Sequence, residues 1–278
     1  MKKQLLVVEG NAKATSQIMI DLGARPYAES YAALLQNLSP EVECTILHPA
    51  EDGPDCLPHG KAFTDYDGIV WTGSALNCYD TTPEVLHQIE MAKGAYPSGV
   101  PIFGSCWGLQ IFVVALGGKV RLNPNGREIG IARDITLNKV GETHPMYAGK
   151  GKCFDTFAVH MDEVETLPPN ATLLASNAMS QVQALTIEED GNSFWGVQYH
   201  PEFDFHTMAV VYRRVSKALV KEGYFDDDHA VQEYARGLAA IRPEDSDAIQ
   251  HYAIPAHMLD ASHRTLEIKN WLNCKILT

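Results

Sequence analysis

The sequence of 278 residues has no long apolar run. No stretch approaches the roughly 18 uncharged apolar residues that a membrane-spanning helix needs. The opening segment MKKQLLVVEGNAK is too short, and too soon interrupted by Glu9, to be a secretory signal peptide. We therefore expect a soluble, cytoplasmic protein that does not enter a membrane.

Positive charge is also scarce. The chain carries 22 Lys and Arg against 35 Asp and Glu, a formal net charge of −13 with histidine neutral. No local cluster of basic side chains stands out, and a negative surface repels nucleic-acid phosphates and anionic lipids. We therefore expect neither nucleic acid nor membrane as a partner.

Motifs for metals and nucleotides are missing as well. The six cysteines include no C-x-x-C pair and no regular spacing, which argues against a zinc site or a disulfide framework. We expect reduced thiols, most of them buried. The chain also lacks G-x-x-x-x-G-K-[ST] and G-x-G-x-x-G, so the sequence predicts no metal and no cofactor.

The chain does have alternating strand-like and helix-like segments, and 45% of its residues are hydrophobic. That is enough apolar material for one large domain or two small ones. Apolar runs with strand character occur at 4–8, 42–47, 68–71 and 100–103, and helical spacing of apolar residues occurs at 27–38 and 83–95. Strands alternating with helices predict an α/β fold, with a mostly parallel sheet and helices on both faces.

The sequence pattern changes after Gly118, where short strand candidates are separated by turn residues. These candidates are 132–137, 153–159, 172–175, 182–187 and 194–198. From His206 the pattern becomes helical, so we place a boundary near residue 205 and predict a helical C-terminal extension over 206–278.

Two apolar stripes run through this extension. They consist of Val211, Val215 and Leu219, and of Ile268, Leu272 and Ile276. The helices of the extension either pack on the sheet or, through Trp271 and Leu272, contact another subunit of a homo-oligomer.

The segment most informative about chemistry is the G-x-C-x-G sequence Gly104-Ser-Cys106-Trp-Gly108, which joins an apolar strand to a helix. A sharp turn of this kind lifts its central side chain clear of the sheet, and flanking glycines remove Cβ atoms that would collide. The start of the helix favours a thiolate. The sequence therefore predicts that Cys106 is a nucleophile.

A thiolate needs a base and proton donor, and His200 is the best placed of eleven histidines. It follows the strand candidate 194–198, and Glu202 comes two residues later, where it can fix the imidazole tautomer. His-x-Glu also occurs in zinc deaminases, but their P-C-x-x-C partner is absent here. Cys106, His200 and Glu202 thus form a candidate triad.

An attacked carbonyl also needs donors for its oxyanion. The backbone amide of Trp107, next to the nucleophile, is one candidate. The turn after strand 68–71 supplies the others, the amides of Gly73 and Ser74.

Together these residues resemble the class I, or triad, glutamine amidotransferases, over roughly residues 4–205. Gly104-Ser-Cys106-Trp-Gly-Leu-Gln110 is similar to the family's nucleophile motif, and Val197-Gln-Tyr-His200-Pro-Glu202 to its His-Pro-Glu motif. Lesser landmarks agree at 126–130, 144–146 and 159–164. The overall pattern is similar to the standalone branch that resembles GMP synthase.

The resemblance implies a flavodoxin-like α/β domain in which Cys106 attacks the side-chain amide of glutamine. His200 would protonate the departing ammonia, and water would cleave the γ-glutamyl thioester. Gln110, His160 and Asp162 would hold the amino-acid end of the substrate. The chain departs from the family where Gly73-Ser74-Ala75 replaces the common Gly-Gly-Pro turn.

Three functions are consistent with this pattern. The first is a glutaminase that delivers ammonia to a separate synthetase or acceptor subunit, since the extension is too short to be a synthetase. The second is a hydrolase of γ-glutamyl peptides or conjugates with the same triad, because the two substrates differ only in the leaving amine. The third is a non-catalytic regulatory or binding module on the same fold.

Overall fold

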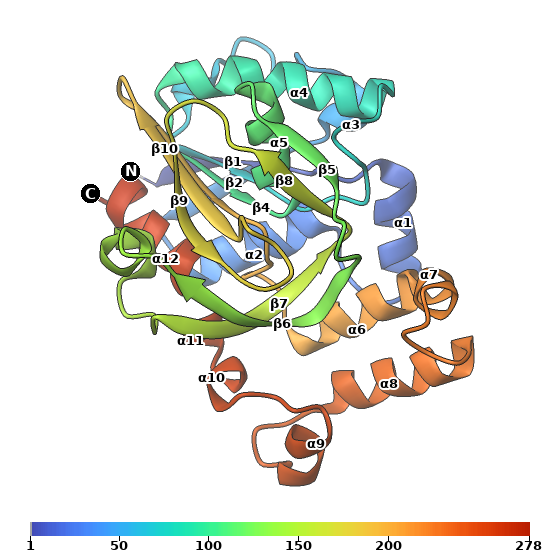
Figure 1. Cartoon of the computed structure of the whole chain (residues 1–278). Helices are drawn as coiled ribbons and strands as arrows, with labels where there is room; N and C mark the ends of the chain where they lie inside the picture. The colour runs from blue at the N-terminus through green and yellow to red at the C-terminus, as the bar shows by residue number, and fades with distance from the viewer. Residues whose placement is uncertain (1) are drawn as a thin grey trace.

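The computed structural model describes residues 2–278, and a nine-stranded sheet lies at its centre (Figure 1). In sheet order the strands are β2 (Val42–Leu47), β1 (Lys3–Val8), β3 (Gly68–Trp71), β4 (Ile102–Ser105), β11 (Asn192–Val197), β10 (Ala184–Glu189), β9 (Ala171–Ser176), β6 (Glu128–Leu137) and β7 (Cys153–His160). The first five pair in parallel, and only β10 and β6 run opposite to the rest. The predicted α/β class with a mostly parallel sheet is confirmed.

Helices cover both faces of this sheet. The helices within residues 2–278 are α1 (Lys13–Asp21), α2 (Tyr27–Leu38), α3 (Pro49–Asp52), α4 (Pro83–Ala95), α5 (Trp107–Ala115), α6 (Phe205–Arg214), α7 (Ser216–Lys221), α8 (Asp228–Ala240), α9 (Ser246–His251), α10 (Ala256–Leu259), α11 (Ala261–Arg264) and α12 (Leu266–Trp271). Alternate residues of β1 face opposite sides: Leu5 packs with α2 and α12, whereas Leu6 packs with α4 and α5. None of the helices within residues 2–278 is long and apolar enough to cross a bilayer.

A second, two-stranded sheet was not predicted. It consists of β5 (Lys119–Leu122) and β8 (Asp162–Thr166), which pair antiparallel. Only Val120 of β5 is buried, and the last two residues of β8 are exposed. Neither strand therefore carries an apolar run that a sequence pattern could reveal.

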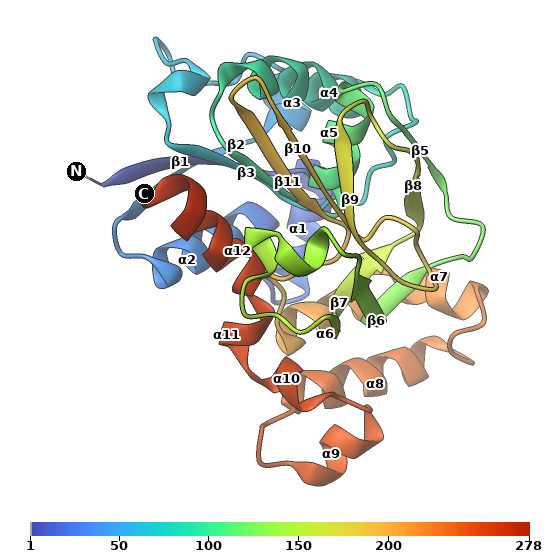
Figure 2. The ribbon, with the colours of Figure 1, turned by 60° about the vertical axis from the view of Figure 1, so that its left-hand side comes forward.

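The C-terminal segment packs into the main core. Ile268 and Trp271 of α12, with Leu272 and Ile276 of the following π-helical turn, are buried against the face of the sheet that α2 also covers (Figure 2). The alternative that Trp271 and Leu272 mark a contact with another subunit is wrong, because both side chains are at most 1% exposed within the single chain.

Helices α6 and α8 pack with α1 against Phe157 and Val159 of β7 in a separate cluster. Val211 and Leu219 are buried there, as the first stripe predicts. The helical region begins at Phe205, capped by Asp204, whose carboxylate accepts a hydrogen bond from the Thr207 amide at 2.7 Å.

The cysteines are all free thiols, but they are less buried than expected. Cys78 and Cys106 are buried, Cys44 and Cys56 are half-buried, and Cys153 and Cys274 are exposed. The expectation that most are buried is wrong, because Cys153 begins an edge strand and Cys274 lies in the last helical turn.

Three neighbouring strands end at the same level. Trp71 of β3 pairs with Gly104 of β4, and Ser105 of β4 pairs with Val197 of β11. The segments that follow these strands therefore emerge at one edge of the sheet, where ligands bind in open α/β folds.

Candidate active site

Cys106 occupies the turn between β4 and α5. Its φ of 53° and ψ of −102° lie in a region that non-glycine residues rarely adopt. The backbone amide donates to the carbonyl of Val197 at 2.8 Å, which ties the turn to β11. The thiol donates to the carbonyl of Val159 at 3.5 Å and lines a pocket.

The two glycines of the turn have no room for a side chain. A Cβ atom on Gly104 would lie 2.6 Å from the carbonyl carbon of Gly108. A Cβ atom on Gly108 would collide with the backbone carbonyl of Trp71. This close packing of strand against helix is the physical reason for the G-x-C-x-G pattern.

His200 follows β11, and its ring is buried between neighbouring side chains. Its Nδ1 is hydrogen-bonded to Oε1 of Glu202 at 2.7 Å, and the ring stacks on Phe203 with centroids 3.9 Å apart. Its Nε2 is buried and makes no hydrogen bond among residues 2–278. Cys106 is a close neighbour of this ring and raises its pKa, so the three predicted triad residues lie together.

Two residues that the sequence analysis missed hold Glu202 in place. Ser105, immediately before Cys106, donates to Oε1 of Glu202 at 3.2 Å, and the hydroxyl groups of Ser105 and Tyr31 lie 3.0 Å apart. The Glu202 side chain is 2% exposed. A buried carboxylate with these donors can orient the imidazole and stabilise its charged form.

The pKa of His200 is raised to about 10. Burial by itself lowers the pKa of His200, but the negative charges of Glu202 and of the Cys106 thiolate outweigh this effect. The imidazole is therefore protonated at neutral pH when Cys106 is a thiolate. Such an ion pair supplies both a nucleophile and an acid for the leaving group.

The predicted oxyanion donors lie near Cys106 and His200. The amides of Gly73, Ser74 and Trp107 donate no backbone hydrogen bond within residues 2–278. Gly73 lies directly against the imidazole, because a Cβ atom there would be 2.6 Å from Cε1 of His200. Free amides beside a nucleophile are the donors that an oxyanion needs.

The turn after β3 is anchored by the segment that follows β1. The side-chain oxygen of Asn11 accepts from the Ala75 amide, and that of Thr72 accepts from the Gly10 amide, both at 2.9 Å. Glycine is needed at Gly10 because a Cβ atom would lie 2.7 Å from the carbonyl oxygen of Gly73. The Gly73-Ser74-Ala75 turn is thus held without the family's proline.

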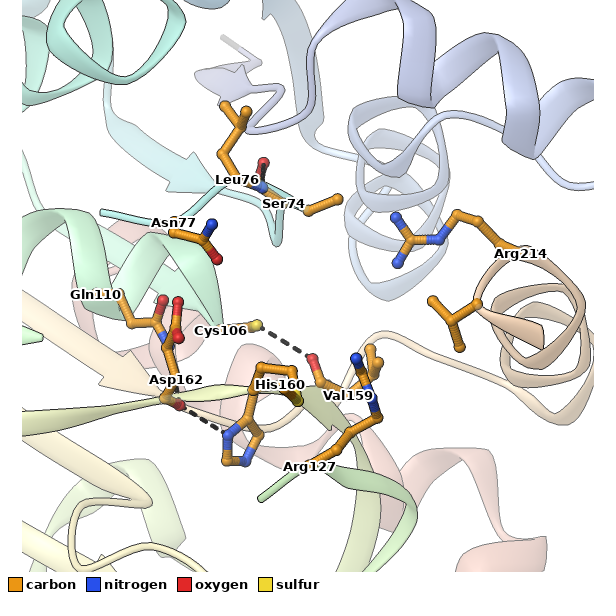
Figure 3. A pocket seen from close by; sticks show the side chains of 13 residues that line it. Ser74, Leu76, Asn77, Cys106, Gln110, Arg127, Val159, His160, Asp162 and Arg214 are labelled. Atoms are coloured by element: carbon orange, nitrogen blue, oxygen red, sulfur yellow. Dashed lines mark hydrogen bonds between the residues drawn. The ribbon is translucent and has the colours of Figure 1, made fainter. Parts of the chain in front are cut away.

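A pocket of about 260 Å³ opens in front of Cys106 (Figure 3). Gln110 and Asp162 lie at one end of it. Nε2 of Gln110 donates to the Asp162 carbonyl at 3.3 Å and to Gln198 at 3.1 Å, so Oε1 is left without a partner among residues 2–278. Asp162 accepts from the Tyr79 hydroxyl at 3.0 Å, and burial raises the pKa of its carboxyl. This end offers acceptors suited to an ammonium group.

His160 lines the same pocket, but both of its ring nitrogens are engaged within the protein. Nδ1 lies 2.9 Å from the carbonyl oxygen of Asp162, and Nε2 lies 2.8 Å from Glu128. His160 is therefore placed to position the Asp162 backbone, with no ring nitrogen left for a ligand. Within residues 2–278, no group of three His, Cys, Asp or Glu side chains is arranged to hold a metal ion.

Residues 27–214 match the model of the family described as glutamine amidotransferase class-I. The chain belongs to this family. A γ-glutamyl-L-1-hydroxyisopropylamide hydrolase from a Pseudomonas species is 34% identical to this amidotransferase-family chain, over 98% of the chain and 92% of the relative.

Two further similar proteins are a synthetase and a protein of known structure. The glutamine-hydrolysing GMP synthase of Nitrosomonas eutropha is 30% identical over 69% of the chain, which spans only 34% of that relative. A glutamine amidotransferase structure from Thermotoga maritima superposes with a TM-score of 0.67, at 16% identity and full coverage of both chains. The family and its relatives identify the chain as a hydrolytic enzyme, which sets aside the non-catalytic alternative.

Two arginines at the far end of this amidotransferase pocket were missed from the sequence. Arg127 and Arg214 both line it (Figure 3). Arg127 lies within the 126–130 landmark, whereas Arg214 is in the last turn of α6, where a basic residue is ordinary because of the helix dipole. No local signal distinguished Arg214 from Arg213 beside it.

Proposed function

We propose that this enzyme hydrolyses γ-glutamyl amides whose leaving amine is larger than ammonia. The observation that supports this most is the shape of the site beyond Cys106. A second hollow of about 420 Å³ adjoins the first pocket and shares Arg127 and Met161 with it. Glutamine ends at its amide nitrogen, so it leaves this hollow empty, whereas an amide with a larger amine extends into it. The Pseudomonas relative carries the name of such a hydrolase.

In the proposed reaction the Cys106 thiolate attacks the side-chain carbonyl carbon of the γ-glutamyl unit. The amides of Trp107, Gly73 and Ser74 stabilise the oxyanion. His200 gives its proton to the leaving nitrogen as the C–N bond breaks, which leaves a γ-glutamyl thioester on Cys106. Water then attacks the thioester, and His200 takes the proton from that water. The thioester breaks to release glutamate and the thiolate.

Glu202 accepts the Nδ1–H hydrogen bond of His200 and holds the ring in place. Gln110 Oε1 and the Asp162 carboxylate receive the α-ammonium group, and His160 acts through the Asp162 backbone. These residue roles rest on the hydrogen bonds described above.

The direct test is to supply purified enzyme with glutamine and with several γ-glutamyl alkylamides and peptides. Glutamate and the released amine are then measured. We expect kcat/KM to be at least about tenfold higher for amides with a larger amine, because the second hollow contributes contacts that ammonia cannot make. Cys106→Ala should abolish release from every substrate, whereas Cys274→Ala, an exposed thiol, should not. Release from glutamine alone would contradict the proposal.

A second candidate is a glutaminase that hands ammonia to a separate acceptor enzyme. It is favoured by the similarity to a glutamine-hydrolysing GMP synthase, a longer relative of which this chain covers only 34%. If glutamine is the only substrate, and a separate synthetase raises its turnover, this candidate replaces the first.

A further inference from the structure

Arg214 has no partner for its charge. Its side chain makes no hydrogen bond or ion pair among residues 2–278, and its Nε is buried without an acceptor. The other arginine of the pocket differs, because Arg127 forms two bonds to Glu222 at 2.8 and 2.9 Å. A buried donor without an acceptor is unfavourable, and an anionic ligand in the pocket would supply the acceptor that Nε lacks.

The position of Arg214 limits which anion that is. Figure 3 shows Gln110 and Asp162 on one side of Cys106 and Arg214 on the other. The α-ammonium and α-carboxylate of a γ-glutamyl unit are bonded to one carbon, so both stay near the acceptors of Gln110 and Asp162. The part of the substrate that extends past Cys106 is the leaving amine. Arg214 lines the first pocket and not the second hollow, so its partner is a group of the amine close to the scissile bond, and only a larger remainder of the amine enters the hollow.

We propose that Arg214 binds a carboxylate carried by the leaving amine, so that the preferred substrates are γ-glutamyl conjugates of amino acids or peptides. This inference rests on the proposed hydrolase function and specifies its substrate class. A guanidinium pairs with a carboxylate through two parallel hydrogen bonds.

The test compares two substrates that differ only at this group. One is γ-glutamyl-L-alanine, and the other is γ-glutamyl-L-alaninol, in which a hydroxymethyl group replaces the carboxylate. The second is the 1-hydroxyisopropylamide in the name of the Pseudomonas relative, so the inferred preference separates this chain from that relative. The measured quantity is the ratio of their kcat/KM values. We expect a ratio of about 10 to 100 in the parent enzyme, because a charge-assisted hydrogen-bonded pair in a partly buried site strengthens binding by about that factor.

Three variants isolate the role of the guanidinium. Arg214→Gln should bring the ratio close to one, and Arg214→Lys should give an intermediate ratio because one donor direction is lost. Arg213→Gln is the matched control on the same helical turn, outside the pocket, and should leave the ratio unchanged. Each ratio is internal to one preparation, so partial misfolding of a variant does not affect it.

The outcomes separate this inference from the function on which it rests. A parent ratio near one, with both amides hydrolysed, overturns the role of Arg214 and leaves the hydrolase function standing. A fall of both rates together in Arg214→Gln, at an unchanged ratio, also overturns it and places the guanidinium on the glutamyl unit instead. If the parent enzyme cleaves neither amide, the proposed function itself has failed.

Discussion

His200 holds its proton far above the ordinary range because two anionic neighbours oppose the effect of burial. Glu202 is the larger of these two influences, and Cys106 is the other. The proton that will reach the leaving nitrogen is therefore already in place at neutral pH. Loss of that proton at alkaline pH removes the acid, so activity should fall as the pH passes through about 10.

Replacing Glu202 by Gln should move that alkaline fall to lower pH. The substitution removes a negative charge that favours the imidazolium, so the pKa of His200 decreases. The neutral amide also holds the ring less firmly, and we expect kcat to fall by about 100-fold or more. The measurement is kcat/KM from neutral to alkaline pH. Glu233→Gln, on the exposed face of α8, is the control. If kcat/KM of Glu202→Gln falls at the same alkaline pH as that of the parent enzyme, the account is contradicted.

The candidate triad could be proposed from sequence because each member lies in a short local pattern. Cys106 has its flanking glycines, and Glu202 is two residues from His200. Ser105 and Tyr31 could not be assigned to Glu202, because these contacts join residues far apart in sequence. His160 shows the reverse problem: its position in the pocket was expected, but its hydrogen bonds to Glu128 and Asp162 depend on strand pairing.

The turn between β4 and α5 is the element on which the site depends. Gly104→Ala should destabilise the protein by about 1–3 kcal/mol, because the new methyl group would overlap the backbone of α5. We also expect lower activity, since the clash displaces Cys106. Urea unfolding and turnover measure the two effects.

Gly94→Ala provides the matched control for that change. Gly94 lies inside α4, and a Cβ atom there would meet only Phe63 at an ordinary 3.6 Å. Alanine favours a helix interior, so this variant should gain about 0.5–1 kcal/mol with unchanged turnover. Equal stability changes in the two variants would show that the turn has more room than the structure indicates.

Several elements were predicted closely from the apolar pattern, whereas one helix was missed. The helices α2 and α4 match the ranges expected from apolar spacing, and the strands β1, β2 and β3 agree to within one residue. Strand β4 begins two residues later than expected, after Pro101, which has no amide hydrogen to donate. Helix α1 was missed because only Met19 of its residues is buried.

At the scale of the whole molecule, a buried ion pair joins the C-terminal helices to the amidotransferase core. Lys150 and Glu267 lie 2.8 Å apart, and their side chains are 1% and 0% exposed. Glu267 also accepts from the hydroxyl of Tyr199, the residue before His200. The two charges are 117 positions apart in sequence, so no local pattern could have predicted the contact.

Glu267→Ala should therefore lower the free energy of unfolding by about 3–5 kcal/mol, because it leaves the Lys150 ammonium buried and unpaired. Lys150→Met combined with Glu267→Leu should recover much of the loss, since it removes both charges. Glu233→Ala breaks an exposed pair with Arg236 and should have little effect. Thermal and denaturant unfolding measure all three. A loss in Glu267→Ala no larger than in Glu233→Ala would contradict this description of the core.

The central claim is that Cys106 forms a covalent γ-glutamyl thioester, and trapping that intermediate tests it most directly. Enzyme turning over a γ-glutamyl amide is quenched in acid, digested and measured by mass spectrometry. We predict a mass increase of one glutamyl unit on the peptide that contains Cys106, on no other cysteine peptide, and none in Cys106→Ala. Continued hydrolysis by Cys106→Ala at the parent rate, with no adduct in either protein, would contradict the account.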